Sequence, residues 1–226
     1  MVIYSVDPSS AMIEYLFPTP FYKNNIPCPK KEWDGMMDVC ERFYNKNIQE
    51  INDCGNFTGD QDTPEFFLLH TTEQFYWLNY HMGQAVKEYL KEITDDENYS
   101  VFFQKSWPNV TRLEDGGNPN HYHKGSHFSG VYYLRTEGSG GTLNLQSGNE
   151  MDMLPLNLKP HLGIFQFNPV DGDLIVFPSS VMHNVRGFSG SHYRASIVYD
   201  IFITSSETVD DRYENIVTSP HLWVRV

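Results

Sequence analysis

The first hundred residues contain two stretches whose apolar residues recur at the spacing of an α-helix. Between residues 31 and 50 the apolar positions lie three or four apart, which predicts an amphipathic helix. These positions are Trp33, Met36, Met37, Cys40, Phe43, Tyr44 and Ile48. A second helix is expected over residues 72–94, where the apolar set is Phe75, Leu78, Met82, Ala85, Val86, Tyr89, Leu90 and Ile93. Thr71 and Gln74 resemble a capping box at its start, and the polar segment between the helices predicts a loop.

After residue 100 the pattern changes to short β-rich runs separated by Gly, Asn, Asp and Pro. The runs are VFFQKSWPNVTRL, FSGVYYL, GTLNLQ, LGIFQFNPV, DLIVFPSSV and YRASIVYDIFI. Asp171-Gly172, between two of them, predicts a hairpin turn. Several short strands at close spacing are typical of a sandwich or barrel. We therefore predict a mainly β protein with flanking helices, in which an antiparallel double-stranded β-helix (jelly roll) carries the two helices outside one sheet.

This pattern fits a single domain over all 226 residues. Residues 16–100 are expected to form a helical N-terminal support, and residues 101–204 the jelly-roll core. Residues 205–226 form a C-terminal tail that is polar and then aromatic, and its pattern predicts no element.

Composition narrows the classes of partner and compartment. The net charge is −13, and an acidic surface repels phosphate backbones, so we expect no nucleic-acid partner. No stretch approaches the roughly 20 apolar residues of a membrane span, and the N-terminal segment lacks the features of a signal peptide. Three cysteines without CxxC pairing indicate reduced thiols and a cytoplasmic location.

Three histidines lie within seven positions in NPNHYHKGSHFSG, residues 118–130. His121 and His123 are two apart, so on a strand both would point to one face and offer a pair of imidazole ligands. His183 follows another apolar run and is the candidate for a third ligand. Gly125 and Ser126 favour a turn that carries His127 away, so we expect His127 at the mouth of the site, facing substrate rather than metal.

Arg194 lies in the apolar run YRASIVYDIF. A buried arginine needs an anionic partner because an unpaired buried charge is costly. Ser196 is two residues on and shares its strand face, so guanidinium and hydroxyl together could clamp a carboxylate. The alternative is a structural ion pair with Asp173 or Asp200.

These motifs resemble the iron(II)- and 2-oxoglutarate-dependent oxygenases, and most closely their bacterial and phage branch and the prolyl 4-hydroxylases. The resemblance covers roughly residues 16–203 and rests on HYH, SGVYYL, GGTL, DGDLIVFPSSVMHNV and RxS, supported by LFPTPFY and SWPN. It implies iron(II) held by His121, His123 and His183, and 2-oxoglutarate held by Arg194 and Ser196.

The resemblance also implies a reaction with O2 that hydroxylates a peptidyl, amino-acid or other small-molecule substrate. Such relatives carry an aspartate where this chain has His123, which leaves the site one charge unit more positive. A three-imidazole iron site is chemically reasonable, since imidazole is a suitable ligand for iron, as it is for zinc, copper and nickel.

Other residues are expected near the site or away from it. Alternation places Ser129, Val131 and Tyr133 on one face, so Tyr133 would reach the cofactor, and Trp107 and Asn109 would flank the site towards substrate. The remaining histidines are interpreted as structural or solvated: His70, His81, His161, His192 and His221. Two other functions stay open, a non-enzymatic jelly-roll module of binding or viral structural type and a cupin-like metal enzyme that does not use 2-oxoglutarate.

Overall fold

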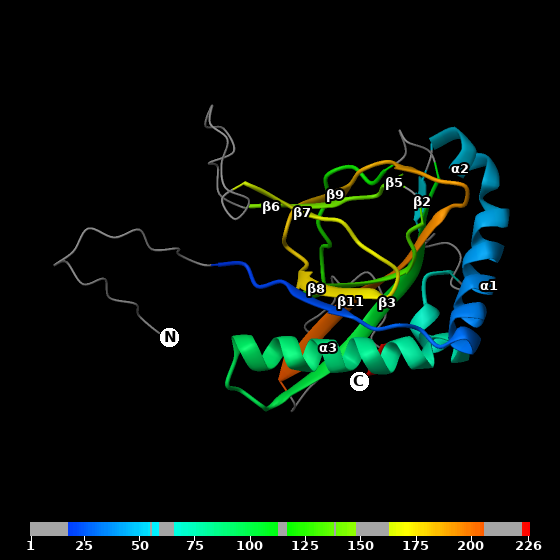
Figure 1. Ribbon diagram of the computed structural model, residues 1–226. Helices are drawn as coiled ribbons and strands as arrows, with labels where there is room; N and C mark the ends of the chain where they lie inside the picture. The colour runs from blue at the N-terminus through cyan, green and yellow to red at the C-terminus, as the bar shows by residue number, and fades with distance from the viewer. Residues whose placement is uncertain are drawn as a thin grey trace.

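The strands form a seven-stranded sheet and a smaller three-stranded sheet above it, with the helices outside the larger one (Figure 1). This computed structural model describes residues 18–54, 56–58, 66–112, 117–137, 139–147, 163–205 and 223–226. The large sheet has the order β1-β8-β4-β11-β3-β12, with β2 also paired to β3; the small sheet is β7-β6-β9, and β10 pairs with β5. Neighbouring strands are antiparallel.

The strand bounds place β3, β4, β6, β7, β8 and β11 on the six predicted runs, whereas β1, β2, β5, β9, β10 and β12 lie outside those runs. The strands are β1 Tyr22–Asn25, β2 Asn56–Thr58, β3 Tyr99–Thr111, β4 Phe128–Arg135, β5 Ser139–Gly140, β6 Leu143–Gln146, β7 Ile164–Phe167, β8 Asp173–Pro178, β9 His183–Val185, β10 Phe188–Ser189, β11 Arg194–Ser205 and β12 Val224–Arg225. The mainly antiparallel double-stranded β-helix predicted from the sequence is therefore confirmed.

Alternation along the central strands divides the interior into two cores. On β4, Tyr132 and Leu134 face the helices, whereas Val131 and Tyr133 face the small sheet. The other central strands behave alike: Leu174, Val176, Ala195, Ile197 and Tyr199 lie on the helix side, and Ile175, Phe177 and Val198 lie between the sheets. Both faces of the sheet are thus buried, which explains why these strands read as continuous apolar runs.

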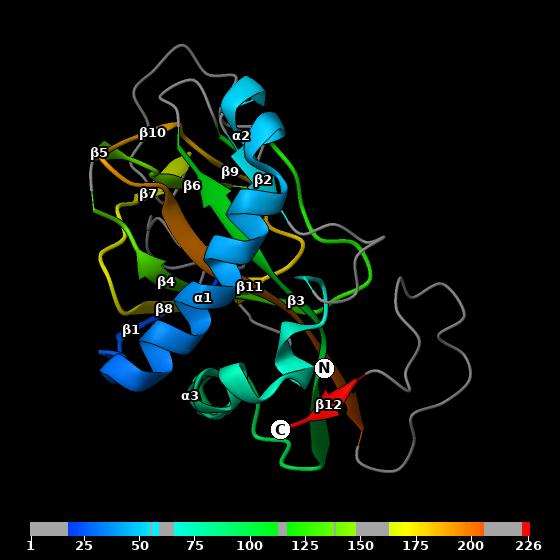
Figure 2. The same ribbon diagram turned by 90° about the vertical axis from the view of Figure 1, so that its right-hand side faces the viewer.

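The helices cover the outer face of the large sheet, as predicted (Figures 1 and 2). α1 spans Lys30–Lys46 and α2 Ile48–Cys54, so the single helix expected over 31–50 is interrupted. The reason is Asn47, whose side chain donates a hydrogen bond to the Phe43 carbonyl at 2.9 Å and ends α1. Ile48 is consequently exposed, and Ile51 is buried in its place.

The second predicted helix begins later than expected. α3 spans Tyr76–Ile93, after the short 3-10 turns η2 (Leu69–Thr71) and η3 (Glu73–Phe75). The capping-box prediction was wrong, because the Thr71 hydroxyl donates to the Leu68 carbonyl instead and no side chain caps α3. Of the loop predicted over residues 52–65, the first three residues belong to α2 instead and residues 56–58 form β2, while the rest lies outside the described residues.

A turn does occur at Asp171-Gly172, where Gly172 has a φ of +85°. It is not a hairpin, because β7 pairs in the small sheet and β8 in the large one. The turn therefore carries the chain from one sheet to the other, and the prediction of paired flanking strands was wrong.

The C-terminal end of the chain joins the large sheet. Most of the predicted tail lies outside the described residues, but its last four residues place β12 beside β3 and pack Val226 against Gly83 of α3 (Figure 2).

Cys28 and Cys40 are free thiols. Within the described ranges, no helix combines the length and apolar character needed to cross a bilayer.

Candidate metal and cofactor site

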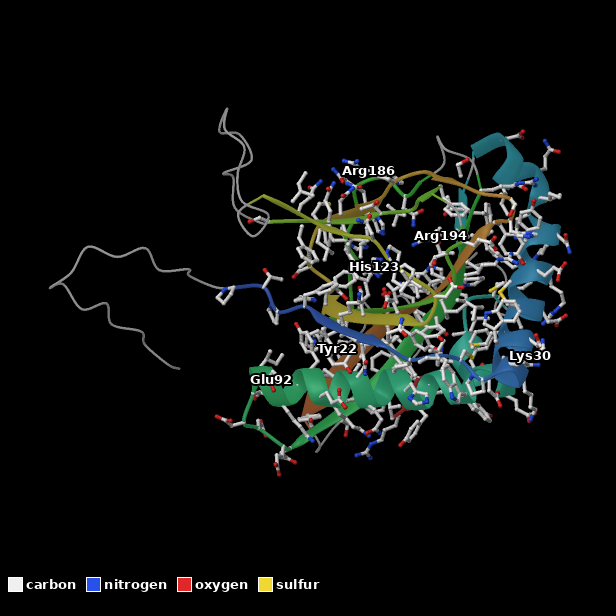
Figure 3. All side chains as sticks on the ribbon, in the orientation of Figure 1. Tyr22, Lys30, Glu92, His123, Arg186 and Arg194 are labelled. Atoms are coloured by element: carbon white, nitrogen blue, oxygen red, sulfur yellow. The ribbon has the colours of Figure 1, made fainter. Side chains whose placement is uncertain are left out.

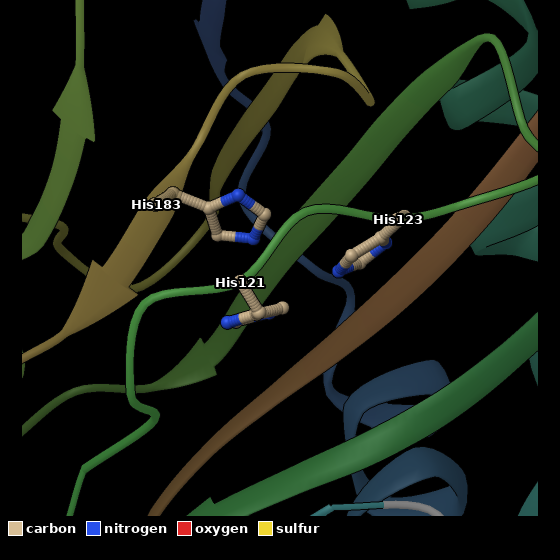
Figure 4. A group of neighbouring side chains, drawn as sticks. All are labelled: His121, His123 and His183. Atoms are coloured by element: carbon tan, nitrogen blue, oxygen red, sulfur yellow. The ribbon is translucent and has the colours of Figure 1, made fainter.

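Three imidazoles converge between the two sheets (Figure 4). His121 and His183 form an isolated antiparallel bridge, with reciprocal backbone hydrogen bonds of 2.9 and 2.8 Å. His123 is tied to the Ser179 carbonyl through its backbone N–H at 3.0 Å. One ligand atom from each ring lies within 4.8 Å of the others, as a shared metal ion requires.

The local backbone differs from the strand that the sequence suggested. His121 lies in the bridge, but His123 is outside any strand, and β4 begins only at Phe128. The rings of His121 and His123 still lie 5.3 Å apart between centroids. Backbone hydrogen bonds to β9 and to the end of β8, rather than strand alternation, hold the two histidines together.

Each imidazole is anchored through Nδ1. That atom lies 2.7 Å from the Pro119 carbonyl in His121, 2.8 Å from the Val181 carbonyl in His183, and 2.6 Å from Asp200 Oδ1 in His123. A carbonyl or carboxylate oxygen can only accept, so each Nδ1 donates its proton and each Nε2 keeps a lone pair. The set therefore offers three Nε2 atoms to one metal.

Burial favours the neutral form of two of these rings, those of His121 and His183. Desolvation, reinforced by His121, lowers the pKa of His183 to about 3, and desolvation also lowers the pKa of His121. Asp200 behaves differently: burial alone would raise its pKa, but the His123 hydrogen bond and the Lys105 ammonium outweigh it and lower the pKa. The site thus combines two imidazoles whose pKa values are lowered with one carboxylate, Asp200, whose pKa is also lowered.

A cavity of about 490 Å³ opens between the sheets beside the imidazoles. It brings together eight of the nine residues that the sequence proposed for the site: His121, His123, His183, Arg194, Ser196, Tyr133, Trp107 and Asn109. Figure 3 shows His123 and Arg194 in the same interior space between the sheets. The candidate metal ligands and the residues proposed to clamp a carboxylate therefore line the same cavity.

Arg194 is 2% exposed, and among the described residues its Nε and Nη1 have no hydrogen-bond partner. Its guanidinium lies 5.1 Å over the Tyr133 ring. Both alternative carboxylates are engaged elsewhere, Asp173 with Lys23 at 3.4 Å and Asp200 with Lys105 at 2.6 Å. A buried cation with unpaired donors beside a cavity fits the carboxylate of a small acid, which agrees with 2-oxoglutarate as a cofactor.

His127 is not among the residues that line the cavity. Its Nδ1 accepts a hydrogen bond from the Ile203 N–H at 3.0 Å, and its ring stacks on Phe202 at 4.2 Å. It is separate from the other three histidines, as expected, but the structure does not place it at the mouth of the site. The reason is that its own backbone is already paired with β11 and with Ser179. Of the five histidines read as structural, His161 and His221 lie outside the described residues.

Sequence reasoning missed two residues behind the imidazoles, Asp200 and Lys105. Asp200 was considered only as a partner for Arg194. Its even spacing from Arg194 and Ser196 along one strand was the available signal, since it puts all three on the same face. Lys105 is the cross-strand partner of Asp200 on β3, which no sequence pattern indicates.

Residues 105–200 match the family described as "Putative 2OG-Fe(II) oxygenase". No similar sequence was found among curated proteins. Among solved structures, the carbocyclase SnoK from nogalamycin biosynthesis, described as non-heme and alpha-ketoglutarate-dependent, is similar at a TM-score of 0.55 and 10% identity, covering 92% of each chain.

AviO1 from Streptomyces viridochromogenes Tue57 is similar at a TM-score of 0.53 and 12% identity, covering 82% of this chain and 90% of that one. An oxidoreductase of the 2OG-Fe(II) oxygenase family from Burkholderia pseudomallei has a TM-score of 0.45 and 17% identity, and the match spans 58% of each chain. At these identities, the similarity to SnoK and AviO1, whose TM-scores exceed 0.5, shows that the fold is shared.

Proposed function

Because residues 105–200 match the 2OG-Fe(II) oxygenase family, whose cofactors are iron(II) and 2-oxoglutarate, we propose that His121, His123 and His183 hold the metal and that Arg194 and Ser196 hold the cosubstrate. The reaction would be hydroxylation of a peptidyl, amino-acid or other small-molecule substrate with O2. The observation that carries the proposal is one cavity shared by three anchored imidazoles and a buried guanidinium, whose Nε and Nη1 have no hydrogen-bond partner among the described residues.

When bound, iron(II) and 2-oxoglutarate supply the oxidative decarboxylation that activates O2 for attack on a C–H bond. The chain's own residues bind and orient the cosubstrate and exclude water from the site. Arg194 presents a planar fork to the far carboxylate of the cosubstrate, and the Ser196 hydroxyl lies on the same strand face. The ring of Tyr133, under the guanidinium, limits where that carboxylate can sit.

The rest of the cavity wall is proposed to receive the substrate. Trp107 lies 5.5 Å from the His123 ring between centroids, and Val131 and Val198 add apolar surface. Asn109 is 5% exposed, and its Oδ1 has no hydrogen-bond partner within the described structure. An acceptor left unpaired in a cavity wall suits a donor group of a ligand.

Anaerobic titration of the purified protein with iron(II) and then 2-oxoglutarate tests this proposal. We expect the weak visible charge-transfer band of the iron–2-oxoglutarate chelate. In Arg194→Lys the charge is kept but the planar fork is lost, so 2-oxoglutarate affinity should fall roughly tenfold or more while iron binding survives.

The matched control is Arg135→Lys, which changes a partly buried arginine that donates to the Tyr193 carbonyl away from this cavity. It should leave 2-oxoglutarate affinity unchanged. Absence of the band in the wild type would instead favour a binding module or a metal enzyme that uses no 2-oxoglutarate. An unchanged affinity in Arg194→Lys would place the clamp elsewhere.

A further inference from the structure

A chain of charged groups leads from the cavity wall to one of the three imidazoles. Asp200 has no solvent exposure, and its Oδ1 accepts from His123 Nδ1 at 2.6 Å. Its Oδ2 lies 2.6 Å from the Lys105 ammonium. That ammonium also lies 5.3 Å from the centre of the Trp107 ring. His121 and His183, in contrast, are anchored by backbone carbonyls that lie two residues before them.

This difference matters because a backbone carbonyl cannot change its hydrogen-bonding role, whereas a side chain can. The tautomers of His121 and His183 are therefore set by the fold itself. The tautomer of His123 depends on Asp200, together with the Ser129 hydroxyl at 3.1 Å, which can donate or accept. An acceptor oxygen in this position, here that of the carboxylate, places the proton on Nδ1 and leaves Nε2 free for a metal.

Lys105 in turn determines how the Asp200 side chain is used. An ammonium has three donors and no acceptor, so it requires an oxygen on the side that faces it. The carboxylate forms an ion pair with Lys105 through Oδ2 and accepts the His123 hydrogen bond through Oδ1. An amide at this position has one oxygen only, and Lys105 would claim it.

We propose that Asp200 is a positioning residue that fixes His123 as an Nε2 ligand, and that Lys105 fixes the orientation of Asp200. The inference rests on the proposed metal site and goes beyond it, since neither residue is a ligand. It also identifies His123 as the ligand of the three whose metal-binding form is controlled by side chains.

Asp200→Asn tests this inference. Lys105 should hold the amide oxygen, so the amide N–H would point at His123 Nδ1, and the imidazole proton would move to Nε2. Iron(II) affinity, measured anaerobically by competition with a chromophoric chelator and without 2-oxoglutarate, should fall about 10- to 100-fold.

Two further variants separate positioning from a general loss of structure. Asp173→Asn removes another carboxylate without solvent exposure, on β8 and outside the cavity lining, and should leave iron affinity unchanged. Lys105→Met combined with Asp200→Asn frees the amide to turn its oxygen back to His123. That double variant should recover part of the lost affinity, which a purely structural role for Asp200 does not predict.

A second readout needs no variant of Asp200. Imidazole ¹⁵N NMR of the metal-free wild type, with the His123 signals assigned by their loss in His123→Gln, should show the proton on Nδ1. A wild type with the His123 proton on Nε2 would overturn the inference even if Asp200→Asn fails to fold.

The outcomes also distinguish this inference from the proposed function. A wild type that takes up no iron(II) would overturn the metal site itself. A wild type that binds iron(II), together with an Asp200→Asn variant of equal affinity or a double variant that recovers nothing, would overturn the role of Asp200 alone.

Discussion

At the scale of single residues, the space around the Arg194 side chain is created by a glycine. Gly141 has a φ of +69°, and a Cβ there would lie 2.7 Å from both Cδ and Nε of Arg194. The position therefore requires glycine twice, once for its backbone conformation and once for the close approach. The motif GGTL has a physical meaning that its sequence alone does not reveal, because neither requirement leaves a pattern.

Gly141→Ala should weaken 2-oxoglutarate binding about tenfold or more, because the new methyl displaces the guanidinium, and should also cost about 1–2 kcal/mol of stability from backbone strain. Gly125→Ala is the control, since Gly125 has a φ of +84° and nothing lies within 4 Å of its Cβ position. It should show the strain without the loss of affinity. Calorimetric titration and thermal unfolding measure both, and equal 2-oxoglutarate affinities in the two variants would contradict this account.

At the scale of elements, β11 supplies both the proposed clamp and its support. Arg194, Ser196, Val198 and Asp200 face the cavity side, while the residues between them pack towards the helices. This two-residue repeat was visible in the sequence, so the strand, its buried arginine and the serine beside it could be predicted. The hydrogen bond between Asp200 and His123 could not be predicted, because it depends on how the irregular segment before β4 packs against β8 and β9.

The same limit explains the other errors. Periodicity located both helices but not the break at Asn47, which a single side-chain hydrogen bond to the backbone produces. The turn at Asp171-Gly172 was recognised from its residues. Which strands it joins depends on pairings with distant parts of the chain, and local pattern carries no information about those.

The contact of α3 with β4 gives an element-scale prediction. A Cβ on Gly130 would lie 2.5 Å from Met82 Sδ, the far part of a flexible side chain. Gly130→Ala should destabilise the protein by about 1–3 kcal/mol through overpacking, and Met82→Ala by about 2–5 kcal/mol through a cavity. The double variant should be less destabilised than the sum by about 1 kcal/mol or more, because the alanine fills part of the vacated space. Additive free energies of unfolding, measured in urea, would show that helix and sheet do not meet at this point.

At the scale of the whole molecule, an acidic protein of net charge −13 encloses a site in which burial lowers the pKa of His183 and of His121. The pKa of His183 falls to about 3 in the folded chain through burial, whereas an unfolded histidine has a pKa of about 6.5. Between these values the unfolded state binds more protons, so stability rises with pH across this window. Asp200, with its lowered pKa, loses its contribution only at more acidic pH, below the ordinary aspartate value.

The metal-free protein should therefore lose about 2 kcal/mol of stability from His183 alone between pH 7 and pH 5. Urea unfolding at the two pH values measures this loss, and His183→Gln should show a correspondingly smaller one. A wild type as stable at pH 5 as at pH 7 would mean that His183 is not buried in its neutral form.

The most direct test of the central claim replaces each of four histidines by alanine and measures bound iron after anaerobic reconstitution with iron(II). We expect large losses of bound iron in the variants at His121, His123 and His183, whose rings share one metal-sized space. We expect near-normal bound iron in His127→Ala, because that ring lies against Phe202 and Ile203. Near-normal iron in the His123 variant would contradict the three-imidazole site, and loss of iron in the His127 variant would contradict the placement of the metal.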